Sequence, residues 1–330
     1  MTSNAFILAG DIGGTKTHLG LFQKGKHRPV LRALETYESR EAPGLTHLIG
    51  TFLNQHPATV KRACFGVAGP VFDGRSKTTN LPWQVSEREI QKRFGWKRVH
   101  LVNDLTATAL SLPLLRGKEL FSLNRIRVKK GRNMALVAPG TGLGHALLIY
   151  RKGGYMPVPS EGGHVEFAPV NGEQIRLLRY LQARYGHVSN ERVVSGPGLV
   201  RIYNWLKDSG TYPEPAWLRE AMAAEDPAKV VAENALAGKH PLCTAALQMF
   251  VSVLGAVAGN LALTGLATGG VYLGGGIPPK ILPTLRSPLF FEGFTGKGRF
   301  RELLERTAVR VILNERAALL GAARGALQRA

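Results

Sequence analysis

Glycine-rich turns occur three times in the 330-residue sequence, and the first of them contains an acid. In "AGDIGGTKTHLGLF", Asp11 lies in the turn between two apolar runs. Glycine lets backbone N–H groups approach phosphate oxygens, because no Cβ stands between them. A carboxylate beside such N–H groups repels a bare phosphate but suits one that carries Mg²⁺. The turn therefore predicts a magnesium–nucleotide site, with Asp11 reaching Mg²⁺ through water and Gly13, Gly14 and Thr15 offering backbone N–H groups.

The other two glycine turns are Gly140–Gly144 and Gly274–Gly276. None of the three matches a P-loop, which needs Gly-Lys-Ser/Thr before a helix, and "GTGLG" lacks the third glycine of the dinucleotide fingerprint. The alternative is that the glycines only make tight hairpins. Three such turns, two of them between apolar runs, favour phosphate binding. The similarity of "AGDIGGTKTHLGLF" to "APGTGLGHALLIY" also indicates a weak internal duplication.

Asn103 and Asp104 follow the apolar run "RVHLV" and precede a predicted helix that begins at Leu105. Ligands of open α/β sheets gather at the carboxyl ends of strands, so this pair is a candidate for substrate binding. The alternative is that Asp104 caps the helix, which is a common use of aspartate. Position alone favours the cap slightly and leaves both roles open.

Two further segments contain polar side chains that suit hydroxyl groups: "PSEGGHVEF", with Glu161, His164 and Glu166, and "GHVSNERVV", with Glu191. A metal pair of Glu161 and His164 needs a helix, and the two glycines between them disfavour one. Carboxylates, an amide and an imidazole together suit a sugar, because each hydroxyl both donates and accepts a hydrogen bond.

The composition, 44% hydrophobic and 20% charged, is that of a globular protein. Cys64 and Cys243 are the only cysteines and form no metal-ligand pair, so a cytoplasmic location is expected. The N-terminal apolar run has no basic flank and stops after five residues, which is typical of a first strand and not of a signal peptide. Glycines and polar residues interrupt the longest apolar stretch, Met249–Leu273, so no membrane partner is expected.

The charge balance is strongly basic, with 43 Lys and Arg against 23 Asp and Glu and a formal net charge of +20. Such a chain attracts anions. The densest run, "RIRVKKGR" from Arg125 to Arg132, is either a solvated surface, which the sequence favours, or an anion-binding segment. Aromatic residues do not interleave it, as a single-strand binder requires, so no specific nucleic-acid partner is expected.

Two helices have features that can be checked residue by residue. One is predicted to begin after Ser86, which forms a capping box with Glu89, and to end at Gly95. The other is the long apolar segment "PLCTAALQMFVSVLGAVAGNLALTGL", in which Gly255 and Gly259 are expected to let another element pack closely.

The chain is long enough for two domains, and the absence of Pro/Ser-rich linkers predicts that short hinges join them. We expect one domain over 1–114 plus 305–330 and the other over 115–304. The last helix is expected to pack on the N-terminal domain. Residues 172–185 are predicted to form a helix that places three apolar residues on one face: Ile175, Leu178 and Leu181.

The sequence resembles the bacterial glucokinases, in the hexokinase-like branch of the actin-like ATPase and sugar kinase superfamily. The resemblance covers nearly the whole chain and rests on motifs in a fixed order: "GDIGGTK", "VNDLTATAL", "APGTGLG", "PSEGGHVEFAP", "GHVSNERVVSGPGLV" and "GGVYLGGGI". It implies an α/β protein of the two-domain actin-like ATPase (ribonuclease H-like) fold, with a small α/β domain, a larger α+β domain and a cleft between them. It also implies a homodimer.

The resemblance further implies phosphorylation of D-glucose to glucose 6-phosphate by ATP with Mg²⁺. Asp104 would be the catalytic base on the 6-hydroxyl and a sugar ligand, and the other sugar ligands would be Asn103, Glu161, His164 and Glu191. ATP would be bound by residues of the three glycine turns: Gly10, Asp11, Ile12, Gly13, Gly14, Thr15, Gly140, Thr141, Gly142, Gly144, Gly274, Gly275, Gly276 and Ile277.

Some features leave alternatives open. Repressor–kinase relatives have a zinc-binding cysteine cluster, and this chain has only two cysteines, so zinc is not expected. Lys16 stands where close glucokinases often have Asn, and the charge is high, so polyphosphate remains an alternative phosphoryl donor. A kinase for another hexose or an amino sugar would use the same chemistry. A sugar-sensing regulator is disfavoured, because no DNA-binding headpiece precedes the turn at Gly10.

Overall fold

The computed structural model describes residues 6–78 and 81–328, and its contacts divide the chain into two compact units. The first unit comprises Met1–Glu119, Tyr155–Pro159 and Asn314–Ala330, and the second comprises Leu120–Gly154 and Ser160–Leu313. The sequence placed the return to the first domain at residue 305, whereas these contacts place it after residue 313, because the last strand, β13 (Val309–Ile312), pairs with strands of the second unit.

The first unit is built on a five-stranded sheet in the order β3-β2-β1-β4-β7. Its strands are β1 (Phe6–Ile12), β2 (Lys16–Gln23), β3 (Val30–Glu38), β4 (Val60–Val67) and β7 (Arg98–Asn103), and a small second sheet pairs β5 (Arg75–Lys77) with β6 (Gln84–Ser86). The helices are α1 (Leu45–Gln55), α2 (Glu87–Phe94), α3 (Asp104–Ser111) and α13 (Ala317–Gly325), with short 3₁₀ turns at Ser39–Glu41, Leu112–Leu114 and Gly117–Glu119.

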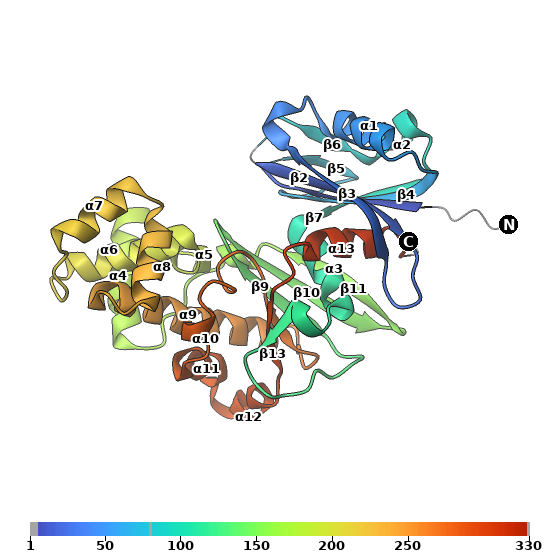
Figure 1. The fold of residues 1–330 in the computed structure, drawn as a ribbon. Helices are drawn as coiled ribbons and strands as arrows, with labels where there is room; N and C mark the ends of the chain where they lie inside the picture. Colours follow the sequence, from blue (N-terminus) through green and yellow to red (C-terminus); the bar gives the residue numbers. More distant parts are fainter. Residues whose placement is uncertain (1–5, 79–80, 329–330) are drawn as a thin grey trace. The chain divides into compact units, whose positions relative to one another are not determined.

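The two faces of this sheet are covered by different helices (Figure 1). Ala63 and Phe65 of β4 belong to the core that α1 closes with Ile49 and Phe52. Cys64, which points the other way, lies against α13, where a Cβ on Gly325 would be 3.0 Å from its sulfur. The last helix therefore packs on the N-terminal domain, as predicted.

The second unit repeats the same sheet order with different strands. Its sheet contains β8 (Leu120–Ser122), β9 (Met134–Pro139), β10 (Leu143–Arg151), β11 (Gly154–Ser160), β12 (Val271–Leu273) and β13, in the order β11-β10-β9-β12-β13-β8. The edge strand β11 contains Tyr155–Pro159, the residues that the contacts group with the first unit. In both sheets the central strand pairs antiparallel with the strand that follows its turn, and parallel with a strand from later in the chain. The weak duplication in the sequence thus corresponds to a repeated topology.

Most helices belong to the second unit. They are α4 (Gly172–Tyr185), α5 (Asn190–Val193), α6 (Gly196–Asp208), α7 (Ala216–Ala224), α8 (Pro227–Leu236), α9 (Pro241–Thr264), α10 (Leu282–Leu285), α11 (Pro288–Thr295) and α12 (Arg301–Glu305), with 3₁₀ turns at Gly162–His164 and Gly298–Phe300. In the view of Figure 1, α4–α8 lie to the left of its sheet and α9–α12 lie below it. By length and composition α9 could cross a membrane, contrary to the expectation from the sequence, but most of its apolar residues are buried inside this unit.

Two local predictions were wrong in detail. Ser86 precedes α2 in extended conformation, but its side chain makes no capping bond, so the capping box is not formed. The first residue of the helix, Glu87, uses its Oε1 to accept a hydrogen bond from the Leu101 N–H of β7 at 2.7 Å. In α4 the buried residues are Gln174, Leu177 and Leu181, while Ile175 is 42% exposed. The buried residues alternate spacings of three and four, which matches the 3.6 residues of a helical turn. The predicted residues are each three apart, and such a row turns gradually away from the inner face of the helix.

The glycines of α9 allow α11 to cross it closely, as predicted. A Cβ on Gly255 would overlap the Phe290 carbonyl, and a Cβ on Gly259 would overlap the Phe294 carbonyl. Gly293 of α11 makes the same close approach from the other side, against the Ser252 carbonyl. The two helices therefore meet backbone to backbone.

We expect Gly255→Ala to lower the stability of the protein by about 1–3 kcal/mol, because a backbone carbonyl cannot move aside for the added methyl group. The matched control is Gly50→Ala in α1, where the added Cβ meets nothing within 4 Å. That control should raise stability by up to about 1 kcal/mol through helix propensity. Thermal unfolding measures both, and equal melting temperatures for Gly255→Ala and wild type would contradict the packing argument.

Candidate active site

The first unit brings its predicted acids to one edge of the sheet. β1, β4 and β7 run parallel, and their register pairs Asp11 with Gly66 and Val67 with Asn103. Asp11 and Asn103 therefore lie at the carboxyl ends of strands two places apart in the sheet, about 10 Å across at the usual strand spacing. This edge is where ligands bind in open α/β sheets.

Asn103, and not Asp104, is the N-cap of α3. Its Oδ1 accepts the N–H of Leu105 at 2.9 Å and of Thr106 at 3.4 Å, while its Nδ2 donates to the Gly69 carbonyl at 3.3 Å. The alternative reading of Asp104 as the cap was therefore wrong, because Asn103 already has the extended backbone that the position needs. The Oδ1 atom of Asn103 is therefore occupied by the backbone N–H groups at the start of α3.

Asp104 is the first residue of α3, and its carboxylate is held close to the helix start. Its Oδ1 accepts the Leu105 N–H at 2.8 Å. Gly66 of β4 lets the helix come close, since a Cβ there would be 2.9 Å from Ala107 Cβ and 3.7 Å from Asp104 Cα. The carboxylate is thus positioned by a sheet glycine and by its own backbone.

The first glycine turn is braced from within the unit. The Gly13 N–H donates to the Lys16 carbonyl at 3.0 Å, so it is not the open donor that the sequence suggested. Ser39 closes the turn from outside: its N–H donates to the Thr15 carbonyl at 2.7 Å, and its hydroxyl donates to the Gly13 carbonyl at 2.9 Å. Nothing in the sequence pointed to Ser39, because β3 separates it from the turn.

Asp11 is half-buried, and burial raises the pKa of its carboxyl to about 6. Burial disfavours the charged form, and a cation beside the carboxylate would restore it. One carboxylate at a glycine turn suits Mg²⁺ that keeps most of its waters, so the residues present fit the predicted metal.

The raised pKa of Asp11 predicts a pH-dependent stability in the ligand-free protein. Between pH 3.8 and about 6 the folded state binds more protons than the unfolded state, so stability falls as pH rises through that window and stays lower above it. Asp11→Asn should therefore be more stable than wild type at pH 8, by up to about 3 kcal/mol, and less so at pH 5. Urea melts at the two pH values measure this.

The control for this measurement is Asp73→Asn, because Asp73 is exposed and its left-handed backbone, with φ of 50°, tolerates Asn. It should show no pH-dependent difference from wild type. The explanation by burial fails if Asp11→Asn and wild type have the same stability at pH 8.

In the second unit the other two glycine turns lie side by side at the end of β9. The Gly274 N–H donates to the Val137 carbonyl at 2.9 Å, and the Ile277 N–H donates to the Pro139 carbonyl at 3.4 Å. Gly275 has φ of 78°, and a Cβ on it would overlap Pro139. Gly144 is part of β10, paired with Ala138, so the turn itself is shorter than predicted.

Glu191 of α5 supports the turn formed by Gly140, Thr141 and Gly142. Its Oε2 accepts the Leu143 N–H at 2.9 Å, and a Cβ on Gly142 would be 2.6 Å from the same oxygen. The Gly196 N–H, at the start of α6, donates to the Gly140 carbonyl at 2.8 Å. The motif "GHVSNERVVSGPG", predicted to bind sugar, is therefore packed on the turn predicted to bind phosphate.

The segment that contains Glu161 and His164 is fastened to the same place. Gly163 lies against the Leu143 carbonyl so closely that a Cβ would overlap it. The Asn190 N–H donates to the Val165 carbonyl at 2.8 Å, which joins this segment to α5. The structure thus fastens the segment of Glu161 and His164 and the helix of Glu191 at one end of β10, and their sugar-binding roles stay predictions.

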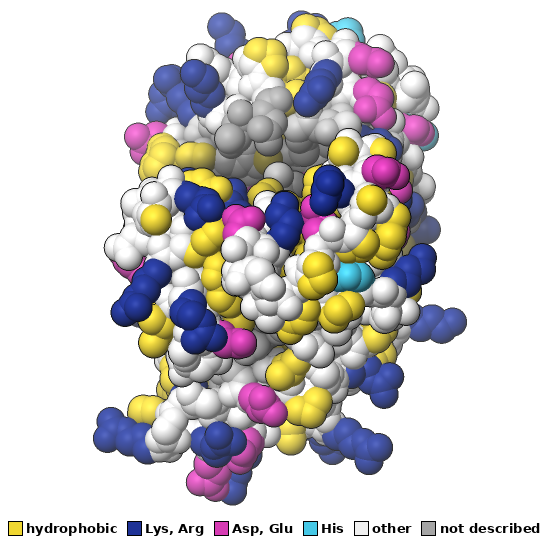
Figure 2. Space-filling model, turned by 90° about the vertical axis from the view of Figure 1, so that its left-hand side faces the viewer, with side chains coloured by type: hydrophobic (Ala, Val, Ile, Leu, Met, Phe, Trp, Pro, Cys, Tyr) yellow, Lys and Arg dark blue, Asp and Glu magenta, His cyan; other side chains and the backbone are white. Residues whose placement is uncertain are grey.

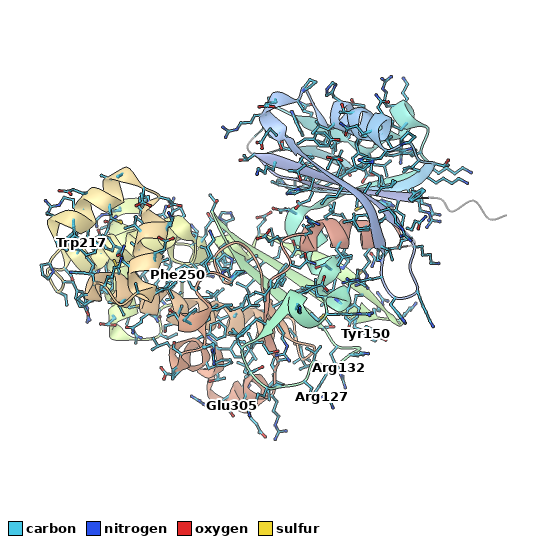
Figure 3. The ribbon with its side chains drawn as sticks, viewed as in Figure 1. Arg127, Arg132, Tyr150, Trp217, Phe250 and Glu305 are labelled. Carbon is cyan, nitrogen blue, oxygen red and sulfur yellow. The ribbon has the colours of Figure 1, made fainter. Side chains whose placement is uncertain are left out.

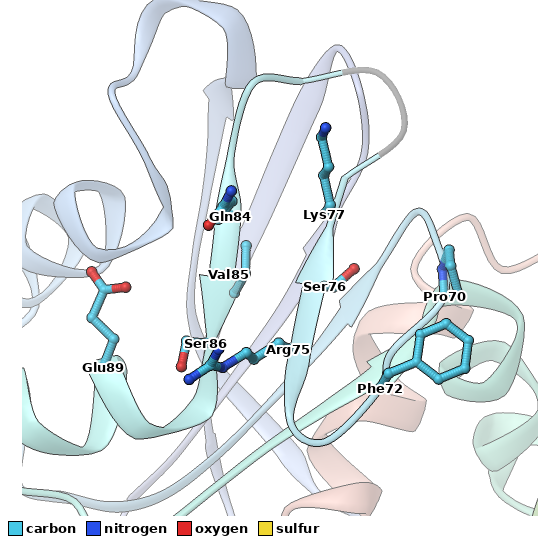
Figure 4. A pocket seen from close by; sticks show the side chains of 9 residues that line it. All are labelled: Pro70, Phe72, Arg75, Ser76, Lys77, Gln84, Val85, Ser86 and Glu89. Atoms are coloured by element: carbon cyan, nitrogen blue, oxygen red, sulfur yellow. The ribbon is translucent and has the colours of Figure 1, made fainter.

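A pocket of about 570 Å³ in the first unit was not predicted (Figure 4). The paired strands β5 and β6 line it with Arg75, Ser76, Lys77, Gln84, Val85 and Ser86, and Pro70, Phe72 and Glu89 complete the lining. It is connected to Asn103 through the hydrogen bond to Gly69, the residue before Pro70. The only sequence signal was the Gly69-Pro70 turn, which does not indicate a pocket by itself.

Comparison with known proteins adds to this geometry. The family described as Glucokinase matches residues 8–329. The sequence is 38% identical to a glucokinase of Nostoc punctiforme, over 96% of this chain and 97% of that one. The structure is similar to a glucokinase from an Antarctic psychrotroph (TM-score 0.89, 30% identity, 98% of both chains). It shares the fold of a ROK family glucokinase from Streptomyces griseus, solved with glucose and AMPPNP (TM-score 0.65, 22% identity, 98% and 100% of the chains).

The repeated sheets and the turns at their strand ends define a two-domain sugar kinase of the actin-like ATPase fold. With a match over nearly its whole length, the chain belongs to the glucokinase family. The predicted family, fold class and enzyme class are confirmed. The roles of individual side chains remain predictions.

Proposed function

We propose that this protein transfers the γ-phosphoryl group of ATP to the 6-hydroxyl of D-glucose. The observation that carries the proposal is the full-length family match, in which the glycine turns and the polar motifs occur together. The glucose and AMPPNP named with the Streptomyces griseus protein support the same pair of substrates. A cytoplasmic location, a homodimer and the lack of specific nucleic-acid or membrane partners also remain predictions.

In the proposed reaction Asp104 orients the 6-hydroxyl and accepts its proton as the oxygen attacks the γ-phosphorus. The bond from that phosphorus to the bridging oxygen breaks, and ADP leaves with the electron pair. The transition state is loose, so positioning matters more than a strong base. Mg²⁺ bound through Asp11 would neutralise phosphate charge. The turns at Gly140–Gly142 and Gly274–Ile277 would hold the nucleotide.

Sugar recognition is assigned to Asn103, Glu161, His164 and Glu191. The structure supports a division of work within Glu191, since Oε2 supports the glycine turn while Oε1 is the oxygen we assign to a sugar hydroxyl. A site built from such polar groups penalises sugars that leave them unmatched. Another hexose, an amino sugar or polyphosphate as donor are the alternatives.

A coupled assay that crosses ATP, ADP and polyphosphate with glucose, mannose, fructose and N-acetylglucosamine tests the substrates. We expect kcat/KM for glucose with ATP to exceed that for N-acetylglucosamine by at least about tenfold, because polar groups of the site that the sugar leaves unmatched cost binding energy in the transition state. Equal values for the two sugars would contradict the sugar assignment. Faster turnover with polyphosphate than with ATP would contradict the donor.

Asp104→Asn tests the base. Because Asn103 provides the cap, the variant should fold. We expect kcat to fall at least about 10²-fold, the usual cost of losing a general base, while the Kd for glucose changes much less. Calorimetric titration with glucose separates binding from turnover. The control Glu220→Gln, at an exposed carboxylate of α7, should behave as wild type. A folded Asp104→Asn protein with more than about a third of wild-type kcat would refute the assignment.

A further inference from the structure

The proposed function leaves the basic charge of the chain unexplained. On the face in Figure 2, Lys and Arg side chains are dispersed, with Asp and Glu between them. One place in the second unit differs. A pocket of about 620 Å³ at the edge strand β8 is lined by four arginines, and no acidic side chain is among its described lining residues. These residues are Arg125, Arg127, Arg286 and Arg310, and none of them has been assigned to ATP or glucose.

The pocket is built from three separate segments. Arg125 and Arg127 follow β8, in the segment that leads to β9, where Figure 3 labels Arg127 and Arg132. Arg286 follows α10, and Arg310 belongs to β13. The first half of the basic run seen in the sequence therefore meets arginines that lie more than 150 residues away along the chain.

Arg310 fixes the frame of the pocket. Its Nη1 donates to the Asn124 carbonyl at 3.0 Å, and its Nη2 donates to the Ile126 carbonyl at 2.6 Å. Asn124 is held in turn, because its Nδ2 donates to the Thr307 carbonyl at 2.9 Å and its Oδ1 accepts the Val309 N–H at 3.1 Å. The backbone that presents Arg125 and Arg127 is thus pinned to β13.

The pocket has no anion of its own. The nearby ion pairs join Arg301 to Glu305 at 3.6 Å and Arg306 to Glu302 at 2.6 Å, both within one helical segment. Among the ion pairs of residues 6–78 and 81–328, none includes a pocket arginine. Like charges around one cavity repel each other, and an anion placed between them reverses that cost.

The chemistry of the pocket selects among anions. Guanidinium groups bind carboxylate and phosphate oxygens alike through paired N–H donors, which disfavours halide. Among the oxyanions, phosphate carries more negative charge and more acceptor oxygens than a lone carboxylate, so several arginines around one cavity favour phosphate. Arginines from three segments match a ligand that has at least two phosphate groups. The volume is that of a small-molecule site, and Phe121 is the one aromatic residue in the described lining, so bases of a nucleic-acid strand have no row of rings on which to stack.

We propose that this pocket is a second anion site, distinct from the predicted nucleotide turns, which binds a small oligophosphate or bisphosphate. Arg127 and Arg286 contact the phosphate groups from two sides, and Arg310 holds the frame. The site makes use of charge that the phosphoryl-transfer reaction does not need.

The test uses the full-length protein with its proposed substrate sites filled by glucose and by AMPPNP with Mg²⁺. Isothermal titration in two arms, with inorganic tripolyphosphate and with a hexose bisphosphate, should show one additional site for at least one of them, and the tighter arm identifies the ligand class. In the double variant Arg127→Gln/Arg286→Gln we expect the affinity of this site to fall at least about tenfold, since each lost guanidinium removes charge-assisted hydrogen bonds.

The matched control removes the same charge elsewhere, in Arg132→Gln/Arg299→Gln, whose residues are exposed and do not line the pocket. It should retain the site, and both double variants should phosphorylate glucose with wild-type kcat/KM when no oligophosphate is added. The proposal is overturned if neither ligand binds beside AMPPNP, or if the control loses as much affinity as the pocket variant. It is also overturned if a single-stranded oligonucleotide of equal charge binds the same arginines more tightly than either ligand. Loss of binding alone leaves the proposed kinase reaction intact, so the two hypotheses fail separately.

Discussion

The predicted site residues of the second unit are arranged around one hydrogen bond, in which the Leu143 N–H donates to Oε2 of Glu191 at 2.9 Å. Leu143 is the first residue of β10, so the bond fixes the point where the glycine turn ends and the strand begins. The space around it is tight, because a Cβ at Gly142 would be 2.6 Å from that oxygen and a Cβ at Gly163 would overlap the Leu143 carbonyl. The turn assigned to phosphate, the segment of Glu161 and His164, and α5 therefore share one support. A carboxylate assigned to sugar recognition also shapes the nucleotide turn, which couples the two recognition tasks inside a single unit.

In the first unit, the position of α3 and its acid depends on glycines in the sheet and in the last helix. Gly66 lets α3 approach β4, and Gly321 of α13 lies so close to α3 that a Cβ would overlap the Ala107 carbonyl. Close packing of this kind leaves α3 little freedom to shift, and a shift of about 1 Å at a reacting group can cost two orders of magnitude in rate. The acid at the start of α3 is thus placed by glycines that have no chemical role themselves.

Those parts of the site that depend on short segments of the chain could be predicted from the sequence. The hairpin around Asp11, the strand before Asn103 and the glycine positions of α9 could be predicted, because each depends on residues adjacent in sequence or on helical spacing. Sequence reasoning missed the support by Ser39 and the bond that the Leu101 N–H donates to Glu87, because both join groups that are far apart in the sequence. It missed the capping by Asn103, because two neighbouring polar residues could each occupy the N-cap position. The inner face of α4 was misjudged for a related reason, since packing buried Gln174 and left Ile175 exposed. The arginine pocket needed the fold itself, because only β13 brings Arg310 beside Arg125 and Arg127.

The ligand-free chain therefore carries two charge imbalances of opposite sign, one in each unit. In the first unit burial raises the pKa of Asp11, so the carboxylate is poorly stabilised until a cation joins it. In the second unit four arginines face one cavity without a carboxylate among the described lining residues. Any ligand that binds the folded state alone stabilises it by mass action, and the gain is largest where the bound charge also relieves an existing penalty. Replacing these charged residues by well-packed neutral ones would stabilise the ligand-free protein. The chain therefore keeps charged, ligand-binding surfaces at these two places at some cost in its own stability. Added salt should weaken anion binding in the arginine pocket more than cation binding at Asp11. Salt screens the exposed guanidinium groups, whereas it screens a half-buried carboxylate much less.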